Sequence, residues 1–550
     1  MSSLYFMEDL YLGSLNERMF RAFSPAEPST RVKRLVNDYH DLMKDYDVGR
    51  FEKDGRIPDE VLKRLGALGL FGINIPEAYG GLGFSLTEYL QFIEEAIKLD
   101  VSTALTFMSH TSLGVQVLLL FGDERQKNRY LVPAATGEKI MAFGLTEPDT
   151  GSDARNLQTS AEPSPDGGHY ILSGTKAYIT NANYAGAITV FAQMDPKKPG
   201  HMGVFIVETD WKGVEIGENM PKMGLRASST AFVRLDRVSV PVENLVGKPG
   251  EGFKIAMTIL NYGRLKLGAA AVGLLDQSLK DMKKRAAARL QFGQPIRNFP
   301  LIQEKLVQAR VRRFVSSAMN EFAAAILEKA PKFDPAIETS HCKLFGTTRV
   351  WDTLYDALQV AGGSGYLSTQ PYERRMRDMR AGTLFEGTTE IHSIYPPLFL
   401  LGKLNKRSDM RSKNPISRLL FLIRKAFGRD RWPLVFEDEA MRKASALARA
   451  NVKTLKRMFF LGLLLHGKSF TRQQFLLRRW TTLSMVTYGL LAILASLSAR
   501  QRHGCLERED RELLLYFIEE AREVRKKNKR LLPDKKERLH RVLFERMASE

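Results

Sequence analysis

A block of short, strand-like segments interrupts a chain that otherwise shows long helical periodicity. Within residues 139–250 the apolar runs are short and rich in β-branched side chains, and Gly, Pro and Asp separate them. Such spacing favours a small antiparallel barrel or sandwich over βαβ units, in which helices would alternate with strands. The runs are 140–145, 170–172, 187–193, 203–207 and 231–240.

Helical periodicity fills the sequence on both sides of this block. Before it, Val61, Leu65 and Leu68 fall at helical spacing, and residues 86–99 repeat the pattern. After it come four long helical segments, which predict a four-helix bundle. They span 252–285, 299–328, 334–362 and 383–403, with a break near 365–373. The predicted fold class is therefore mainly α with a central β-barrel.

The 550 residues are too many for one hydrophobic core and predict several domains. A polar stretch after residue 404 is typical of a linker, and a further helical region follows it. The predicted domains are a helical N-terminal domain at 28–138, a β-barrel domain at 139–250, a four-helix bundle at 251–403 and an extra, basic helical extension at 404–550.

The net charge of +20 belongs almost entirely to this extension. Residues 406–550 carry 34 Lys and Arg against 16 Asp and Glu, a net charge of +18. The extension is thus a basic appendage on a nearly neutral body. Its basic cluster at 522–530 has no interleaved aromatic residues, so we expect a solvated helix face and no nucleic acid partner.

Cysteine content and the first residues indicate the compartment. The two cysteines, Cys342 and Cys505, cannot form a disulfide framework, and no Cys/His cluster predicts a metal site. The first ten residues carry acid rather than base and lack a long apolar core, unlike a secretory signal or a transit peptide. We therefore expect a cytoplasmic protein without a signal peptide.

Five stretches combine residue types that suit catalysis or a bound cofactor. Glu386 stands in Leu-Phe-Glu-Gly-Thr-Thr-Glu; residues 143–153 form a Gly/Ser turn after a strand. Residues 178–181 pair an aromatic ring with a hydroxyl, and residues 289–293 offer an arginine suited to a pyrophosphate. A Gly-rich segment, 359–366, closes a helix. Taken singly, each has a plainer interpretation: a solvated turn, a hairpin loop, a core aromatic, a solvated arginine or a helix C-cap.

In this order and spacing, these stretches resemble the acyl-CoA dehydrogenase family over roughly residues 30–402. The basic extension resembles that of the very-long-chain branch. The resemblance implies a helical domain, a β-barrel and a four-helix bundle around noncovalently bound FAD. It also implies α,β-dehydrogenation of long or very long chain acyl-CoA to trans-2-enoyl-CoA in fatty acid β-oxidation.

The resemblance assigns the catalytic base to Glu386, which would take the pro-R α-proton while the β-hydrogen leaves as hydride to the flavin. Isovaleryl- and long-chain-type members place the base on an earlier helix, one residue before an arginine. The matching position here is Gly263, followed by Arg264. Because glycine carries no carboxylate, Glu386 is the remaining candidate.

The resemblance also assigns binding residues. FAD would contact one set within a subunit and another set from a neighbouring subunit, and two residues would close the site behind the base. The first set is Phe143, Leu145, Thr146, Gly151, Ser152, Tyr178 and Thr180; the second is Arg289, Gln291, Phe292, Gln359, Gly362 and Gly363; the closing pair is Thr388 and Glu390. The CoA ester would contact Ser152, Asn261, Arg264 and Gly387.

Two departures and one preference follow from the same comparison. Tyr178 stands where the family most often has tryptophan, and Asp149 and Thr150 replace a usual small pair. Medium-chain members have polar residues near 105 and 109 at the floor of the acyl pocket. Leu105 and Ser109 remove that floor, which favours a longer acyl chain. Beside them, His110 is interpreted as a satisfied core histidine.

The extension begins with a candidate membrane contact at residues 411–431. Its apolar stripe is flanked by arginine and lysine, a combination that suits an anionic membrane surface, although a helix packed on its own protein has the same pattern. The stripe is Ile416, Leu419, Leu420, Ile423 and Phe427. Residues 480–499 are uncharged and long enough to span a bilayer, but their Ser and Thr content favours a buried helix.

The expected partners are an electron-transfer flavoprotein and a second copy of the chain in a homodimer. In a bacterium the protein would lie peripheral to the cytoplasmic membrane. Two alternatives stay open. One is an acyl-CoA oxidase that passes electrons to oxygen. The other is an assembly factor for respiratory complex I, a role that a close branch of the family has.

Overall fold

The computed structural model describes residues 6–21, 23–330, 334–406 and 415–549, and the chain divides into two compact units. The larger unit contains residues 27–309 and 346–388; the smaller contains residues 1–26, 310–345 and 389–550. Helices α11 (Pro300–Lys329) and α12 (Ala336–Ala361) contribute residues to both units.

Helices form the N-terminal part of the larger unit, and short polar side chains fix where several of them begin. Ser85 and Glu88 form a reciprocal capping box at α6, and Asp123 and Gln126 form another at α9. A π-helical turn, His110–Gly114, joins α7 to α8. The helices are α3 (Thr30–Lys44), α4 (Val48–Asp54), α5 (Asp59–Ala67), α6 (Leu86–Ala96), α7 (Val101–Ser109), α8 (Val115–Phe121) and α9 (Glu124–Thr136).

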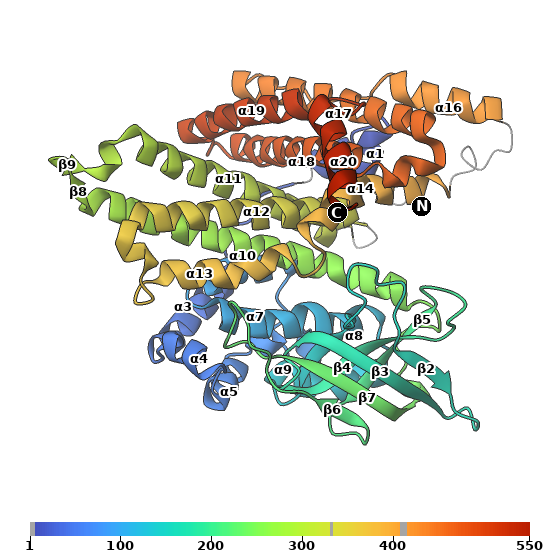
Figure 1. Ribbon diagram of the computed structural model, residues 1–550. Coiled ribbons are helices and arrows are strands. Elements are labelled where there is room, and N and C mark those ends of the chain that lie inside the picture. The colour runs from blue at the N-terminus through green and yellow to red at the C-terminus, as the bar shows by residue number, and fades with distance from the viewer. Residues whose placement is uncertain (1–5, 22, 331–333, 407–414, 550) are drawn as a thin grey trace. The chain divides into compact units, whose positions relative to one another are not determined.

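Seven strands of the larger unit form one sheet in the order β1-β4-β2-β3-β7-β6, with β5 beside β4 (Figure 1). The sheet stays open, as a curled half-barrel, where a barrel was predicted. Most strand pairs are antiparallel, as expected. Strand β1, however, runs parallel to β4, a strand that comes three strands later in the chain. The strands are β1 (Ile140–Gly144), β2 (Ser160–Pro163), β3 (His169–Thr180), β4 (Ala185–Gln193), β5 (Met202–Glu208), β6 (Val214–Ile216) and β7 (Thr230–Pro241).

Each face of the sheet is buried in a different core. On one face, strand residues such as Leu172, Val190 and Val233 pack among themselves inside the curl. On the other, Phe191 and Ile206 pack with residues of α8, α9 and the start of α10 (Gly252–Ala288). Burial on both faces explains why β4 and β5 are almost continuously apolar.

Beyond the sheet, α10 packs with the parts of α11 and α12 that belong to the same unit. Leu279, Met282, Ala309, Ala357 and Val360 form their common core. Helix α13 (Pro371–Arg380) lies where the sequence predicted only a break. It begins at a proline, which has the backbone angle of a first helical residue and needs no hydrogen bond there.

The fourth long helix was predicted at 383–403, but α14 begins only at Thr389 (Thr389–Leu404). The helix cannot start earlier because Glu386 and Gly387 have φ angles of +55° and +99°, outside the right-handed helical region. Since α14 belongs to the smaller unit, the predicted four-helix bundle stays a prediction.

The smaller unit is helical and includes the extension. Its central helix is α18 (Gln474–Arg502), which packs against α14, α17 (Glu439–His466) and α19 (Arg508–Asn528). The indole nitrogen of Trp480 donates a hydrogen bond to the Leu455 carbonyl at 3.0 Å. The remaining described helices are α1 (Met7–Tyr11), α2 (Glu17–Arg21), α16 (Pro415–Phe427) and α20 (Lys535–Met547).

Two stretches have the length and hydropathy to cross a membrane, namely Val101–Phe121 and Gln474–Arg502. In α18, 89% of the most apolar window is buried inside the protein. Its apolar surface is therefore already covered by neighbouring helices, which agrees with the buried interpretation of residues 480–499.

The N-terminal helix α1 is fixed to the smaller unit by buried polar groups that the sequence did not predict. The Met7 amide donates to Glu338 Oε1 at 2.8 Å, and Tyr11 bonds to Ser484, whose hydroxyl lies 2.6 Å from His341 Nε2. Burial raises the pKa of the Glu338 carboxyl to about 8. Residues far apart in the sequence thus share one polar cluster in this core.

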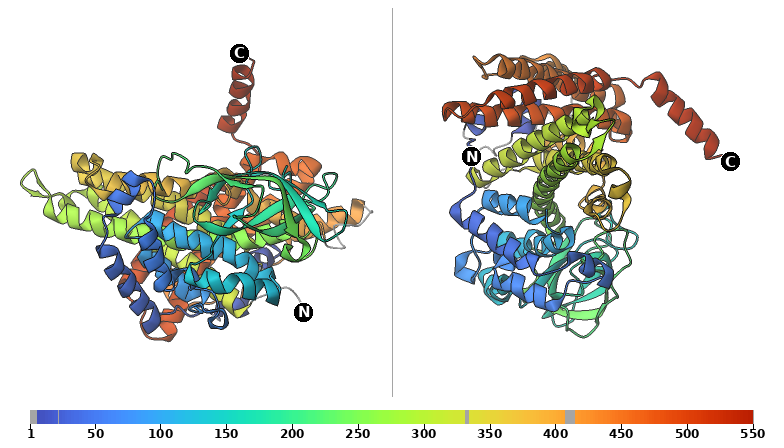
Figure 2. Two further views of the ribbon diagram at one scale, coloured as in Figure 1. Left: turned by 90° about the horizontal axis from the view of Figure 1, so that it is seen from below. Right: turned by 90° about the vertical axis from the view of Figure 1, so that its left-hand side faces the viewer.

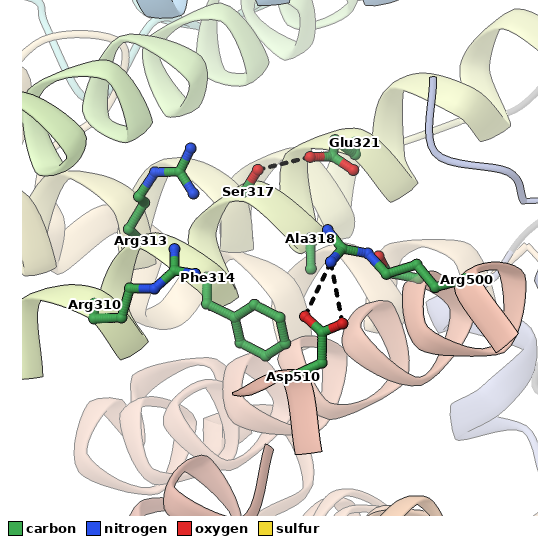
Figure 3. A pocket seen from close by; sticks show the side chains of 9 residues that line it. Arg310, Arg313, Phe314, Ser317, Ala318, Glu321, Arg500 and Asp510 are labelled. Carbon is green, nitrogen blue, oxygen red and sulfur yellow. Dashed lines mark hydrogen bonds and ion pairs between the residues drawn. The ribbon is translucent and has the colours of Figure 1, made fainter. Parts of the chain in front are cut away.

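A small cavity in the same unit, shown in Figure 3, lies between α11, α18 and α19. Arg500 pairs with Asp510 across it at 2.9 Å, and the Ser317 hydroxyl donates to Glu321. None of the residues predicted from the sequence to bind FAD or substrate lines this cavity.

Candidate functional site

Glu386 lies in a tight turn whose backbone aims its side chain at α10. The turn follows a 3₁₀ helix, Ala381–Thr383, and its left-handed φ angles continue through Gly387. A β-carbon placed on Gly263 of α10 would lie 2.6 Å from Glu386 Oε1 and 2.8 Å from Oε2. No side chain fits at position 263 without displacing this carboxylate. The turn thus places the Glu386 carboxylate against position 263, which the sequence comparison offered as the alternative place for a base.

Arg264, a predicted substrate contact, holds the main chain of the same turn, and Asn261, a second predicted contact, accepts a hydrogen bond from Arg264. Arg264 Nε donates to the Glu386 carbonyl oxygen at 3.3 Å, and its Nη1 donates to Asn261 Oδ1 at 3.0 Å. Both side chains are buried. Because they project from α10, a long helix anchors the turn that carries Glu386.

A buried ion pair anchors the predicted loop 143–153 to β3, because Glu147 belongs to the loop and Lys176 to the strand. Lys176 Nζ lies 2.7 Å from Glu147 Oε1 and 3.3 Å from the Leu145 carbonyl oxygen, to which it donates. The Glu147 carboxylate also accepts from the amides of Gln158 and Thr159. Burial lowers the pKa of Lys176 to about 8, against the attraction of Glu147.

The surroundings of this ion pair contain most residues of the first predicted FAD set. The main chain of Thr146 accepts from Ala177, so the loop follows β3 at the level of Tyr178. Phe143 and Leu145 are partly or fully buried, whereas Gly151 and Ser152 are exposed. Tyr178 is 62% exposed, has a φ of +59° and lies beside a register shift in β3. This backbone turns its ring away from the sheet core, and Thr180 follows two residues later.

The second predicted FAD set lies at the other end of α10. Strands β8 (Leu290–Gln291) and β9 (Gln294–Pro295) form a hairpin, with Phe292 and Gly293 at positive φ in its turn. Arg289, Gln291 and Phe292 are exposed. Arg285 Nη2 donates to the Ala361 carbonyl at 3.1 Å, which ties this end of α10 to the next group, Gln359, Gly362 and Gly363. That group is exposed as well.

The larger unit therefore contains all the predicted residues except Glu390, and it arranges them in three groups. The first is the Glu386 turn with Asn261 and Arg264, the second is loop 143–153 with Tyr178 and Thr180, and the third is the β8–β9 hairpin with the Gly-rich segment. Glu390 lies in the first turn of α14, which belongs to the smaller unit, whereas Thr388 is the last residue of the larger one. Sequence reasoning missed Lys176, its contact with Glu147, and a second buried lysine, Lys266 of α10. The sequence contained a signal for Lys266, because this lysine is the charged residue that interrupts an apolar helical run.

The histidine beside the predicted acyl pocket has a structural role. His110 is buried, and its Nε2 donates to the Phe71 carbonyl at 3.1 Å while Nδ1 accepts from the Met141 amide at 2.8 Å. Burial lowers its pKa to about 4. The interpretation as a satisfied core histidine is confirmed. Nearby, Ser109 is buried and Leu105 is partly buried on α7.

Three family models match consecutive parts of the chain. The N-terminal domain of acyl-CoA dehydrogenase matches residues 32–138, the middle domain residues 142–238 and the C-terminal domain residues 250–394. The chain belongs to the acyl-CoA dehydrogenase family. It is an FAD-dependent oxidoreductase that acts on the CH–CH bond of acyl-CoA thioesters.

Relatives and solved structures agree with this assignment. Very long-chain specific acyl-CoA dehydrogenases are 32% identical in Bos taurus, over 90% of this chain and 78% of that protein, and 34% identical in Homo sapiens, over 84% and 73%. An acyl-CoA dehydrogenase of Bacillus subtilis is 36% identical but covers only 64% of this chain. The crystal structure of a Bacillus anthracis acyl-CoA dehydrogenase complexed with FAD matches with a TM-score of 0.82 and 28% identity, over 95% of this chain and 92% of that one.

The ion pair beneath loop 143–153 predicts a large effect on stability. Lys176→Met should lower the free energy of unfolding by about 3 kcal/mol, because the Glu147 carboxylate would stay buried without its counter-charge. The double variant Lys176→Met/Glu147→Gln should be less destabilised. Urea-induced unfolding followed by circular dichroism measures both.

Lys198 provides the matched control, since it forms an exposed ion pair with Asp195 in the same part of the chain. Lys198→Met should change stability by about 0.5 kcal/mol or less. Equal effects at positions 176 and 198 would contradict the structural role of the buried pair.

Proposed function

We propose that this protein dehydrogenates long or very long acyl-CoA chains in fatty acid β-oxidation, with Glu386 as the catalytic base. The observation that supports the proposal is the close approach of the Glu386 carboxylate to Gly263, the position at which the resemblance would otherwise place the base. The chain-length preference is supported by the very-long-chain relatives, whose similarity extends through most of this chain, and by Leu105 and Ser109 on α7.

The residues of the larger unit fit the chemistry that FAD would require. Loop 143–152 offers exposed main-chain groups and hydroxyls, and Tyr178 offers an exposed aromatic face next to it. Arg289 offers a cation for a pyrophosphate. When bound, FAD accepts the hydride equivalent that leaves the β-carbon of the substrate.

Glu386 would take the proton from the α-carbon, so that the CH–CH bond becomes a trans double bond. Arg264, itself held by Asn261, donates to the main chain of the Glu386 turn and thereby fixes the direction from which the carboxylate approaches. Gly263 leaves room for this carboxylate, and Gly387 allows the left-handed turn that carries it. The α-proton is weakly acidic, so such positioning must accompany donors that hold the thioester oxygen.

Removing the carboxylate tests the assignment directly. Glu386→Gln should keep bound, yellow FAD but lose anaerobic bleaching by palmitoyl-CoA by several orders of magnitude, because the amide cannot take the proton. Gly263→Glu combined with Glu386→Gly should restore part of the bleaching, since a carboxylate from position 263 reaches the same place. Stopped-flow absorbance measures both. Near-normal bleaching by Glu386→Gln would refute the assignment.

The same experiment separates the dehydrogenase from an oxidase. After bleaching of the wild-type protein, an oxygen pulse should reoxidise the flavin slowly, whereas an electron-transfer flavoprotein should reoxidise it rapidly. Fast reoxidation with peroxide release would favour the oxidase. A series of acyl-CoA esters from medium to very long chains then gives the preferred length.

A homodimer is the assembly that the exposed second FAD set supports. Phe292 at the tip of the β8–β9 hairpin is 92% exposed. Other large apolar side chains close in sequence to the hairpin or to the Gly-rich segment 359–366 are exposed too: Leu290, Leu301, Tyr366 and Leu367. Exposed aromatic and apolar side chains at such density are typical of a surface that another protein covers. In such a dimer, the pyrophosphate of the FAD held by the partner subunit would lie where Arg289 could bind it.

Arg289→Ala should therefore weaken FAD retention and dimer stability together. Flavin content after gel filtration and sedimentation velocity measure the two losses. Arg297→Ala is the matched control, because this arginine is also exposed and lies just beyond the same hairpin. A flavin-loaded, stable dimer of Arg289→Ala would contradict the shared site.

Membrane association is proposed through α16, the described part of the predicted segment 411–431; residues 411–414 lie outside the described residues. The helix exposes the whole predicted apolar stripe: Ile416, Leu419, Leu420, Ile423 and Phe427. Leu422 and Ala426, on its other side, are buried against the protein. A helix that packs through one face and exposes a second apolar face suits the boundary of a lipid bilayer.

A basic cavity of about 320 Å³ lies next to the C-terminal end of this stripe. Arg449, Lys453 and Arg457 line it from successive turns of α17, and Arg457 also stacks on the Phe427 ring. In the described part of the chain no acidic side chain forms an ion pair with these three residues. Their charge therefore remains available to lipid phosphates beside the apolar stripe.

The stripe predicts how the protein binds vesicles. The double substitution Leu420→Asp/Ile423→Asp should reduce co-sedimentation with phosphatidylglycerol-containing vesicles about tenfold or more, since each buried leucine-sized side chain contributes roughly 1.5–3 kcal/mol. Flavin reduction in solution should stay unchanged. Val435→Asp, at another exposed apolar residue of the same unit, is the control.

Unchanged vesicle binding by the double variant would move the contact elsewhere. Helix α20 also exposes large apolar side chains, among them Leu543 and Phe544. It extends away from the rest of its unit in both views of Figure 2 and contains no buried residue. Leu543→Asp/Phe544→Asp would then identify α20 as the membrane contact.

A further inference from the structure

Lys266 is a fully buried cation in the larger unit, and no role has yet been assigned to it. It projects from the middle of α10, where its neighbours along the helix are Leu265 and Leu267, and it is 1% exposed. A lysine in such surroundings costs stability unless its ammonium group gains a specific interaction. The interactions of this group therefore indicate what the residue contributes.

The contacts of the ammonium group with its packing neighbours are weak. Nζ donates to the Thr111 carbonyl at 3.5 Å and lies 4.5 Å from the centre of the Tyr89 ring. Thr111 belongs to the π-helical turn, and its carbonyl already accepts from Asn74 Nδ2 at 3.2 Å. Within the described ranges, Lys266 forms no ion pair with an acidic side chain.

The carboxylate of Glu386 is the negative charge that acts on Lys266. Lys266 follows Gly263 by three residues, so both lie on the same face of α10, and the Glu386 carboxylate abuts Gly263. Burial lowers the pKa of Lys266 to about 7, and attraction to Glu386 opposes that decrease. The two groups are thus coupled through a region of low solvent access.

The other titratable or charged groups near this pair are Tyr89, His110 and Arg264. Burial raises the pKa of Tyr89, on α6, and lowers that of His110, in the π-helical turn, to about 4, so both are neutral at neutral pH. Arg264, on α10, directs its Nε to the main-chain oxygen of Glu386. Tyr89 and His110 therefore cannot supply the positive charge that Lys266 places, buried on α10, near the Glu386 side chain.

We propose that the Lys266 ammonium group is a positioning residue for this reaction, which keeps the Glu386 carboxylate ionised and directed at the substrate at neutral and mildly acidic pH. This proposal rests on the proposed role of Glu386 as the base. Substrate binding expels water and strengthens the attraction between the two groups. The site thereby holds its base in the form that accepts a proton.

The sign of the pH effect follows from the charges. A cation near a carboxylate favours the ionised carboxylate, so removing the cation lets the carboxylate keep its proton to higher pH. Because only the ionised form abstracts the α-proton, the acid limb of the rate profile must move to higher pH when the Lys266 charge is lost. At high pH the carboxylate is ionised in either case, and the rates should converge.

Two neutral variants separate charge from hydrogen bonding. Lys266→Gln keeps a donor for the Thr111 carbonyl, and Lys266→Met removes both donor and charge. Anaerobic flavin reduction by palmitoyl-CoA is measured by stopped flow from about pH 6 to about pH 9. Both variants should shift the acid limb upward by about one pH unit, so that reduction is about tenfold slower near pH 6 and within about twofold near pH 9.

Lys222 provides the matched control. Burial alone lowers its pKa to about 8, and its ammonium group donates to Asn219 Oδ1 and to the Met220 carbonyl, away from Glu386. Lys222→Met should give the wild-type profile. Lys266→Arg, which restores the charge, should return the acid limb toward its wild-type position. Flavin content and thermal unfolding establish that each variant is folded.

Three outcomes would overturn the proposal. The first is an equal loss of rate at every pH in both variants, which would assign Lys266 to structure alone. The second is a shift in Lys266→Met that is absent in Lys266→Gln, which would assign the effect to the Thr111 hydrogen bond. The third is an altered preference for acyl-chain length with an unmoved acid limb. Failure of the base assignment itself is seen separately, as bleaching retained by Glu386→Gln.

Discussion

The contact between the Glu386 carboxylate and Gly263 is the constraint on which the proposed site depends. It requires a left-handed turn at residues 386–387, a glycine on α10 and an arginine that holds the turn. It also prevents α14 from starting before Thr389, although the helical pattern of the sequence extends further back. One local geometry thus determines a helix boundary, a glycine and the direction of the candidate base.

The sequence predicted much of this arrangement because the chemistry is concentrated in short motifs. Glu386, Arg264 and the loop before Gly151 were identified from residue types at family spacing, and the long helices followed from apolar periodicity. Periodicity alone could not show where a helix stops for a left-handed turn, nor that Pro371 begins a helix inside an apparent break. The parallel pairing of β1 with β4 was equally invisible, since strand partners distant in the chain leave no local pattern.

Buried charges were the main omission. Lys176, Lys266 and Glu338 are all fully buried, and sequence reasoning assigns charged residues to the surface by default. The three are stabilised in different ways: Lys176 by a carboxylate at 2.7 Å, Glu338 by the Met7 amide, and Lys266 by weak contacts and the charge of Glu386. Only the third arrangement lacks a close partner of its own, which is why it points to function rather than to stability.

Backbone strain marks each of the three groups of predicted residues. Among the described non-glycine residues, positive φ angles occur at Tyr178, Asn181, Leu225, Arg237, Phe292 and Glu386. Such a conformation costs about 1–2 kcal/mol for a bulky residue and persists only where the surroundings impose it. Three of these six residues, Tyr178, Phe292 and Glu386, are among the predicted FAD contacts and the predicted base, one in each of the three groups. Strain and motif spacing are unrelated properties, and their coincidence in every group favours a functional role for each of these places in the chain.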